Sequence, residues 1–201
     1  MMTRSLRASL AAPVLLSLIG CAGAPPVGDP RNRLADEPPA ADRIYWPPLY
    51  VPERATFFVH NEIEVAASPE AVWRELIRAE AWPEWYEGAT DVRVVGSESG
   101  ELAHGASIEW RTMGLGFTSV IHEFEPPYRL AWESRRADIT GYHAWLIVPT
   151  EAGCRVITDE SQFGLLAYAQ IVFQPSKLRR LHDVWLAELK RRAEQAEGAS
   201  S

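Results

Sequence analysis

The sequence has only two cysteines, which cannot support a disulfide framework or a cysteine-rich zinc site. Cys21 and Cys154 are the whole complement in 201 residues, and they lie in unlike surroundings. Basic residues are also in the minority, since 20 Lys and Arg stand against 27 Asp and Glu, giving a net charge of -7. A chain of this sign is repelled by polyanions, so we expect no nucleic-acid partner.

Motifs for metals and cofactors are equally scarce. The five histidines are scattered, with no close pair at the spacing of a helical zinc motif, so the sequence predicts no metal ligands. The Gly114-Leu115-Gly116 segment lacks the third glycine and the helix of a nucleotide-binding loop. Cys154 stands beside Gly153 in a predicted turn, without the surroundings of a catalytic nucleophile. We therefore expect no cofactor.

No apolar run near the N-terminus is long enough to cross a membrane. Two arginines precede an apolar run at 8–19, which is shorter than the roughly 20 residues of a spanning helix. This order predicts a cleaved signal peptide at 1–20. Residues 18–21, Leu-Ile-Gly-Cys, resemble the bacterial lipobox, which implies that Cys21 becomes an acylated first residue and attaches the protein to the membrane. Because Ala22 rather than aspartate follows, we expect the periplasmic face of the outer membrane.

A proline-rich tether is predicted between the lipid and the domain, at 21–54. Residues 22–54 contain eight of the fifteen prolines and show no helical period. Within this stretch, Tyr45, Trp46 and Tyr50 are too aromatic for a solvated spacer. They are predicted to dock on the protein's own domain, or else on a partner protein, and the first alternative is favoured.

One folded domain is predicted at 55–196, followed by a disordered tail at 197–201. Alternation predicts a first strand at 55–64, Ser68 is placed to begin a helix, and a short second helix is expected at 82–86. Six further strands are predicted at 90–95, 107–113, 117–124, 129–134, 140–148 and 155–163. From Leu165 the pattern is helical, with Pro175 expected to break or kink it.

This order of elements predicts an α+β helix-grip fold, in which a curved antiparallel sheet of about seven strands wraps around a long C-terminal helix. Four segments resemble the START-like (SRPBCC) superfamily, in its bacterial polyketide cyclase/dehydrase-like branch. They are IEW at 108–110, FTSVIHEFEPPYRLAW at 117–132, HAW at 143–145 and ESQFG at 160–164. The resemblance implies binding of a hydrophobic molecule or a cofactor-independent cyclase reaction, and fold alone does not choose between them.

Alternation along the strands places one set of side chains on the concave face of the sheet, opposite the last helix. This face is predicted either to line an open apolar pocket with a few polar groups or to form a filled core. The predicted ligand-binding residues are Trp110, Phe117, Ile121, Trp132, His143, Trp145, Thr158, Glu160 and Trp185.

Glu160 and His143 are the candidate catalytic residues. A carboxylate on a mainly apolar face needs a partner or has a raised pKa, which suits acid or base chemistry. His143 is able to exchange protons with Glu160 if the two meet across adjacent strands. The structural alternative, which is favoured, pairs Glu160 with Arg111 or with an arginine of the last helix.

Three functions are consistent with these patterns. The first is a lipid-anchored periplasmic domain that binds a hydrophobic small molecule or lipid, without catalysis. The second is a cyclase or dehydrase in which Glu160 and His143 act as acid and base. The third is a tethered interaction module with a closed core.

Overall fold

The computed structural model describes residues 42–200. The predicted signal peptide, the acylated Cys21 and most of the predicted tether lie outside the described residues, so they remain predictions. Within 42–200, none of the helices is both long and apolar enough to span a membrane.

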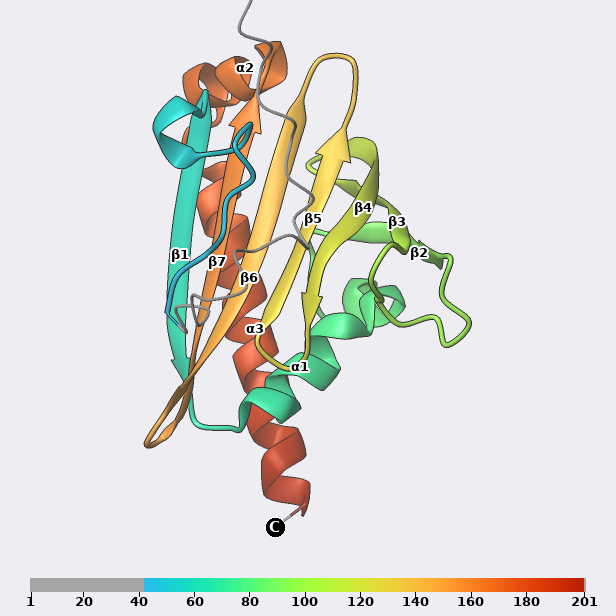
Figure 1. Cartoon of the computed structure of the whole chain (residues 1–201), viewed down its shortest axis with the longest axis vertical. Helices are drawn as coiled ribbons and strands as arrows, with labels where there is room; N and C mark the ends of the chain where they lie inside the picture. Colours follow the sequence, from blue (N-terminus) through green and yellow to red (C-terminus); the bar gives the residue numbers. More distant parts are fainter. Residues whose placement is uncertain (1–41, 201) are drawn as a thin grey trace, which may run out of the picture.

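A seven-stranded antiparallel sheet forms the centre of the fold (Figure 1), in the order β1-β7-β6-β5-β4-β3-β2. Its strands are β1 Phe57–Val65, β2 Thr90–Val95, β3 Ser107–Thr112, β4 Leu115–Glu125, β5 Arg129–Arg135, β6 Thr140–Thr150 and β7 Gly153–Phe163. The helical elements are η1 Pro52–Arg54, α1 Pro69–Ile77, η2 Ala79–Glu84, α2 Leu165–Phe173 and α3 Lys177–Ser200. The predicted α+β helix-grip fold is confirmed.

The two helices after β1 form for local reasons. The Ser68 hydroxyl accepts a hydrogen bond from the Ala71 amide, and Pro69 occupies the first turn of α1, where its missing N–H leaves no carbonyl unpaired. The second helix begins at Ala79 rather than at the predicted residue 82, and it is a 3-10 helix. Pro83 lies within it, and a short helix of this tight type accommodates the missing donor.

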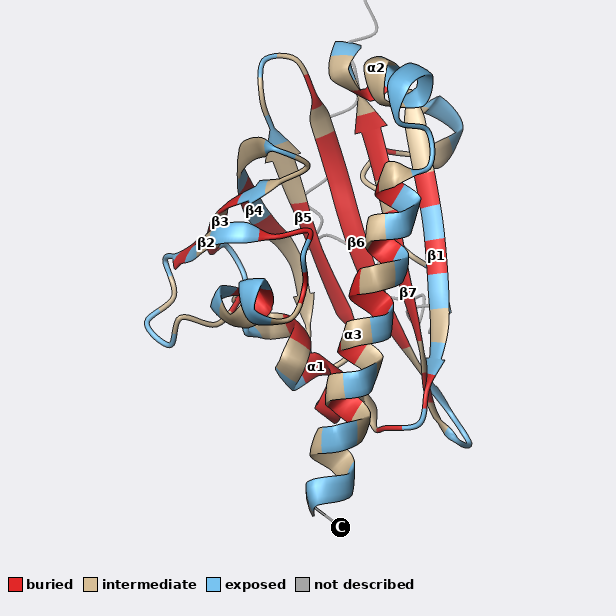
Figure 2. Ribbon diagram, turned by 180° about the vertical axis from the view of Figure 1, so that it is seen from behind, coloured by how far each residue is buried: buried red, intermediate tan, exposed pale blue. Residues whose placement is uncertain are grey.

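Helix α3 lies across the concave face of the sheet (Figure 2), and Leu178, Trp185, Leu186 and Leu189 are among its buried residues. The helical region breaks where Pro175 predicted, because α2 ends at Phe173 and α3 begins at Lys177. The C-terminal prediction was wrong in its boundary. Helix α3 continues to Ser200, so the tail expected to be disordered from 197 is helical to that residue.

Tryptophans fill most of the space between α3 and the sheet. Trp82, Trp132, Trp145 and Trp185 are among the largest fully buried side chains. The ring of Trp185, from α3, lies 4.9 Å from Trp82 and 5.1 Å from Trp145, measured between centroids. These contacts tie the helix to both the sheet and the η2 turn.

The aromatic segment before β1 packs on the opposite, outer face of the sheet (Figure 1). Tyr50 is buried and stacks on Tyr142 of β6 at 5.5 Å between centroids, and Trp46 contacts the same ring at 5.9 Å. The Arg129 guanidinium lies 4.4 Å above the Tyr45 ring. The predicted domain start at 55 was therefore too late, because residues from 42 onward join the fold by covering apolar groups of β6. The favoured alternative, docking on the domain itself, is the one observed.

Removal of this outer segment should destabilise the domain. A chain lacking residues 22–52 should lose about 3 kcal/mol or more of unfolding free energy, because buried aromatic contacts disappear from the outer face. A chain lacking residues 22–39 keeps Tyr45, Trp46 and Tyr50 and should melt within a few degrees of the intact protein. Thermal unfolding of the two deletions would show the difference, and equal melting temperatures would contradict it.

Candidate functional site

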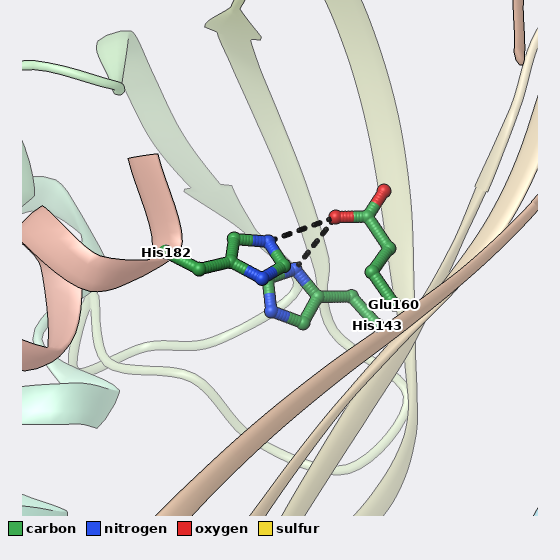
Figure 3. A group of neighbouring side chains, drawn as sticks. All are labelled: His143, Glu160 and His182. Carbon is green, nitrogen blue, oxygen red and sulfur yellow. Dashed lines mark hydrogen bonds and ion pairs between the residues drawn. The ribbon is translucent and has the colours of Figure 1, made fainter. Parts of the chain in front are cut away.

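Three elements bring three titratable side chains to one point on the concave face (Figure 3). His143 of β6 and Glu160 of β7 are register partners in the antiparallel ladder, so their side chains leave neighbouring strands on the same side. His182 reaches them from α3. The predicted meeting of His143 with Glu160 is thus present, and a second histidine joins it.

Both imidazoles face the same carboxylate oxygen. Glu160 Oε2 lies 3.2 Å from His182 Nε2 and 3.4 Å from His143 Nδ1. The two imidazole rings stack on each other, with centroids 4.7 Å apart. The expected pairing of Glu160 with Arg111 or with an arginine of the last helix is wrong. Its ion-pair partners among residues 42–200 are the two histidines, and Arg111 lies 3.7 Å from the Asp91 carboxylate instead.

Hydrogen bonds also engage the atoms of His143 and Glu160 that do not face each other. His143 Nε2 is 2.7 Å from the Thr158 hydroxyl oxygen. Gln162 donates to Glu160 Oε1 over 2.6 Å, and Gln170 of α2 donates in turn to Gln162 over 2.9 Å. The site is therefore connected to α2 through a glutamine pair, and the orientations of both strand side chains are fixed.

Burial and their contacts with each other set the charges of the His143 and Glu160 side chains. Burial lowers the pKa of His143 to about 3, although the nearby Glu160 carboxylate acts in the opposite direction. For Glu160, burial alone would raise the pKa, but the hydrogen bond from His182, the neighbouring imidazoles and Gln162 more than offset it and lower the pKa to about 2. At neutral pH the pair is a neutral imidazole beside an ionised carboxylate.

A cavity of about 240 Å³ opens beside these residues, between the sheet, α2 and α3. Six of the predicted ligand-binding residues line it, and they are Trp110, Phe117, Trp132, His143, Glu160 and Trp185. Further lining residues include Tyr86, Thr112, Leu166, Phe173 and His182. The predicted open pocket is therefore present at the end of the concave face that lies next to α2.

Three predicted ligand-binding residues lie outside the cavity lining. Ile121 and Trp145 belong to the packed core, and Thr158 is fully buried beneath His143. They share the concave face of the sheet, but α3 packs closely there and the Trp185 ring occupies the space in front of Trp145. The filled-core alternative holds for this end of the same face.

Sequence reasoning missed His182 and Tyr86. The ring of Tyr86 stacks on Trp185 at 4.2 Å, and burial together with the Glu160 carboxylate raises its pKa. His182 lies three residues before Trp185, on the stripe of α3 that includes Leu178 and Leu189, and this helical spacing is the signal that was available. Although the histidines form no local metal-binding motif in the sequence, His143, His182 and Glu160 offer ligand atoms within 4.8 Å of one another in the folded chain.

The cavity ends at α2, whose other side is exposed and apolar. Leu166, Ala169 and Phe173 contribute to the lining, while Leu165, Tyr168 and Val172, which do not, are 74%, 59% and 54% exposed. Two indole nitrogens at the cavity, those of Trp132 and Trp185, have no hydrogen-bond partner among residues 42–200. The cavity therefore combines apolar walls with the cluster of His143, Glu160 and His182 and with further polar side chains, among them Gln162, Gln170 and Gln174.

A curved sheet gripping a long helix over such a cavity defines the START-like, SRPBCC class of protein. Within that class, the family described as "Polyketide cyclase / dehydrase and lipid transport" matches residues 56–194, and the chain belongs to this family. No curated protein matches the chain.

Solved structures agree on the fold. A hypothetical protein from Helicobacter pylori, jhp0584, is similar at 26% identity and a TM-score of 0.70, over 76% of this chain and 96% of that one. The di-domain ARO/CYC StfQ of the steffimycin biosynthetic pathway is similar at 16% identity and a TM-score of 0.57, over 70% and 52%. Norcoclaurine synthase from Thalictrum flavum gives 14% identity and a TM-score of 0.55, over 70% and 95%.

Proposed function

We propose that this protein binds a hydrophobic small molecule in the cavity between the sheet, α2 and α3. The observation that carries the proposal is the cavity itself, with tryptophan walls and one polar cluster, His143, Glu160 and His182. The third predicted function, an interaction module with a closed core, is less well supported, because the space between the sheet, α2 and α3 contains a cavity. The family description and the fold of the small-molecule synthase from Thalictrum support a ligand of this kind.

The size of the cavity limits the ligand. At about 240 Å³ it exceeds the roughly 150 Å³ that holds a single benzene-sized molecule and falls below the roughly 300 Å³ of pockets for drug-sized ligands. A compound of one or two rings, or a single short acyl chain, fits these limits. A lipid with two full acyl chains does not, so of the two predicted ligand classes we favour the small molecule.

Catalysis is the second candidate, and the contact between His143 and Glu160 at the cavity favours it. The pKa values of the pair argue against the predicted acid–base division of roles. Values of about 3 for His143 and about 2 for Glu160 leave neither group protonated as an acid at neutral pH. Binding without catalysis therefore remains the better proposal.

The proposed location is the periplasmic face of the outer membrane, with an acylated Cys21 as the anchor. Its support is the short apolar run and the lipobox-like residues at 18–21. Helix α2 lines the cavity with some of its apolar side chains and exposes others, so a hydrophobic compound from a membrane would meet an apolar surface beside the cavity. We propose no protein partner at Tyr45, Trp46 and Tyr50, since these rings are engaged with the domain.

Filling the cavity should abolish ligand uptake. Thr112 lines the cavity from β3, so Thr112→Trp should weaken binding of an apolar naphthalene fluorophore at least tenfold by occupying its volume. Thr118→Trp is the matched control, because Thr118 is exposed on the neighbouring strand β4, and it should bind normally. Fluorescence titration gives both affinities. If the folded wild-type chain takes up no such probe, or if Thr112→Trp binds it as well as Thr118→Trp does, the proposed function is wrong.

A further inference from the structure

The cluster of His143, Glu160 and His182 has the donor set of a metal site. Two imidazole nitrogens and one carboxylate oxygen come together from three different elements (Figure 3). Two histidines and one glutamate are a known combination of protein ligands for zinc. We propose that these three side chains bind a divalent first-row transition-metal cation, with zinc as the best chemical match.

Two of the three distances between the ligand atoms suit a shared cation better than they suit strong hydrogen bonds. Ligand bonds of about 2.0 to 2.2 Å in a tetrahedral site place neighbouring ligand atoms about 3.3 to 3.5 Å apart. Glu160 Oε2 lies 3.2 Å from His182 Nε2 and 3.4 Å from His143 Nδ1. Charge-assisted hydrogen bonds to a carboxylate are shorter, about 2.7 to 2.9 Å. The third separation, between the two ring nitrogens, is at most 4.8 Å, and these nitrogens would have to lie about 3.3 to 3.5 Å apart to share one tetrahedral ion.

The charge balance of the cluster also favours a cation. Glu160 is largely buried, and its ion-pair partners within residues 42–200 are His143 and His182, with no lysine or arginine among them. A cation bound at this point would give the largely buried carboxylate a fixed positive partner, which the described residues do not supply.

The surrounding hydrogen bonds orient the ligands in the manner of a second coordination shell. Thr158 engages Nε2 of His143, which leaves Nδ1 toward the shared point, and Gln162 engages Oε1 of Glu160, which leaves Oε2. On His182, Nε2 faces the shared point. Its buried Nδ1 has no partner within the described part of the chain. Each of the three side chains thus presents a single atom to the same position.

The site would keep one open coordination position. Three protein ligands leave a fourth position at a tetrahedral ion, and all three ligand residues line the cavity. This step rests on the proposed function: a hydrophobic ligand with a carbonyl, carboxylate or phenolate oxygen would place that oxygen on the metal and its apolar part against the tryptophans. The nitrogen ligands select zinc and its neighbours over magnesium and calcium, which prefer all-oxygen sites.

The test is metal binding by the full chain, first freed of metal with a chelator. Calorimetric titration with zinc chloride should show one equivalent bound with a dissociation constant below about 10 μM, and cobalt(II) should give the intense visible absorption of a four-coordinate ion. Magnesium chloride should give no binding at these concentrations. A folded wild-type chain that binds no zinc would overturn the proposal.

Variants locate the ion. His182→Gln and Glu160→Gln should each weaken zinc binding at least 100-fold, and Thr158→Val, which removes only the hydrogen bond to His143, should weaken it 10- to 100-fold. His104→Gln and Glu98→Gln are matched controls at exposed positions and should bind as the wild type does. Circular dichroism checks that each variant is folded. Zinc binding that survives in a folded His182→Gln or Glu160→Gln variant would place the ion elsewhere and overturn the proposal.

A second measurement separates this proposal from the proposed function. Uptake of the apolar fluorophore by the metal-free chain tests the cavity alone, and zinc titration without fluorophore tests the metal alone. Fluorophore binding without zinc binding contradicts only the metal site. Zinc binding without fluorophore binding contradicts only the hydrophobic-ligand proposal.

Discussion

Replacing Trp185 by alanine should lower the free energy of unfolding by about 4 kcal/mol. Trp185 is 1% exposed and is the aromatic ring that joins α3 to the rest of the core. Its centroid lies 4.2 Å from Tyr86, 4.9 Å from Trp82 and 5.1 Å from Trp145. Alanine would leave a cavity among rings from η2, from the loop after it and from β6, and such rigid rings cannot collapse to fill it.

Chemical denaturation of wild type and variant, followed by circular dichroism, measures the change. Leu165→Ala is the control, because Leu165 is 74% exposed on α2 and its loss should cost less than about 0.5 kcal/mol. A Trp185→Ala variant as stable as the Leu165→Ala control would show that α3 is not held to the sheet by this ring.

The Cys21→Ser variant should move the protein from the membrane fraction to the soluble periplasmic fraction. An attached lipid is the anchor implied by the lipobox-like sequence, and serine has no thiol to carry it. Fractionation of cells followed by mass spectrometry of the purified chain measures both the location and the loss of acyl mass.

Cys154→Ser is the matched control for the anchor. Cys154 is fully buried in β7, and burial raises the pKa of its thiol to about 11, so it is neither reachable nor reactive as a modification site. This variant should stay with the membrane. Equal membrane association of the Cys21→Ser and Cys154→Ser variants, with unchanged mass, would exclude lipid attachment at Cys21.

The candidate site was only half predictable from the sequence. Strict alternation places His143 and Glu160 on the same face of neighbouring strands, and the order of hairpins makes those strands adjacent, so their contact followed from local pattern. The contribution of His182 did not follow, because its approach depends on how α3 is rotated and translated over the sheet. Side-chain packing between distant elements sets that placement, and no local period encodes it.

On the outer face of the sheet, too, one part of the structure was predictable from the sequence and another part was not. The aromatic character of Tyr45, Trp46 and Tyr50 predicted that this segment docks, since such rings are poorly solvated. The place of docking was decided by the Tyr142 ring and Arg129, which the sheet presents on its outer side. The predicted boundary at 55 failed because prolines mark the absence of helix and not the absence of packing.

The sequence by itself determined the strand and helix order, the helix-grip class, the break at Pro175 and the set of side chains on the concave face. These features depend on periods of two and 3.6 residues and on residues with restricted backbones, all of which are local. The tertiary structure decided where that face is filled by Trp145 and Trp185 and where it opens into a cavity, and it brought His182 to Glu160. The physical reason is that packing volumes and distances between elements are properties of the assembled core, to which residues far apart in the chain contribute together.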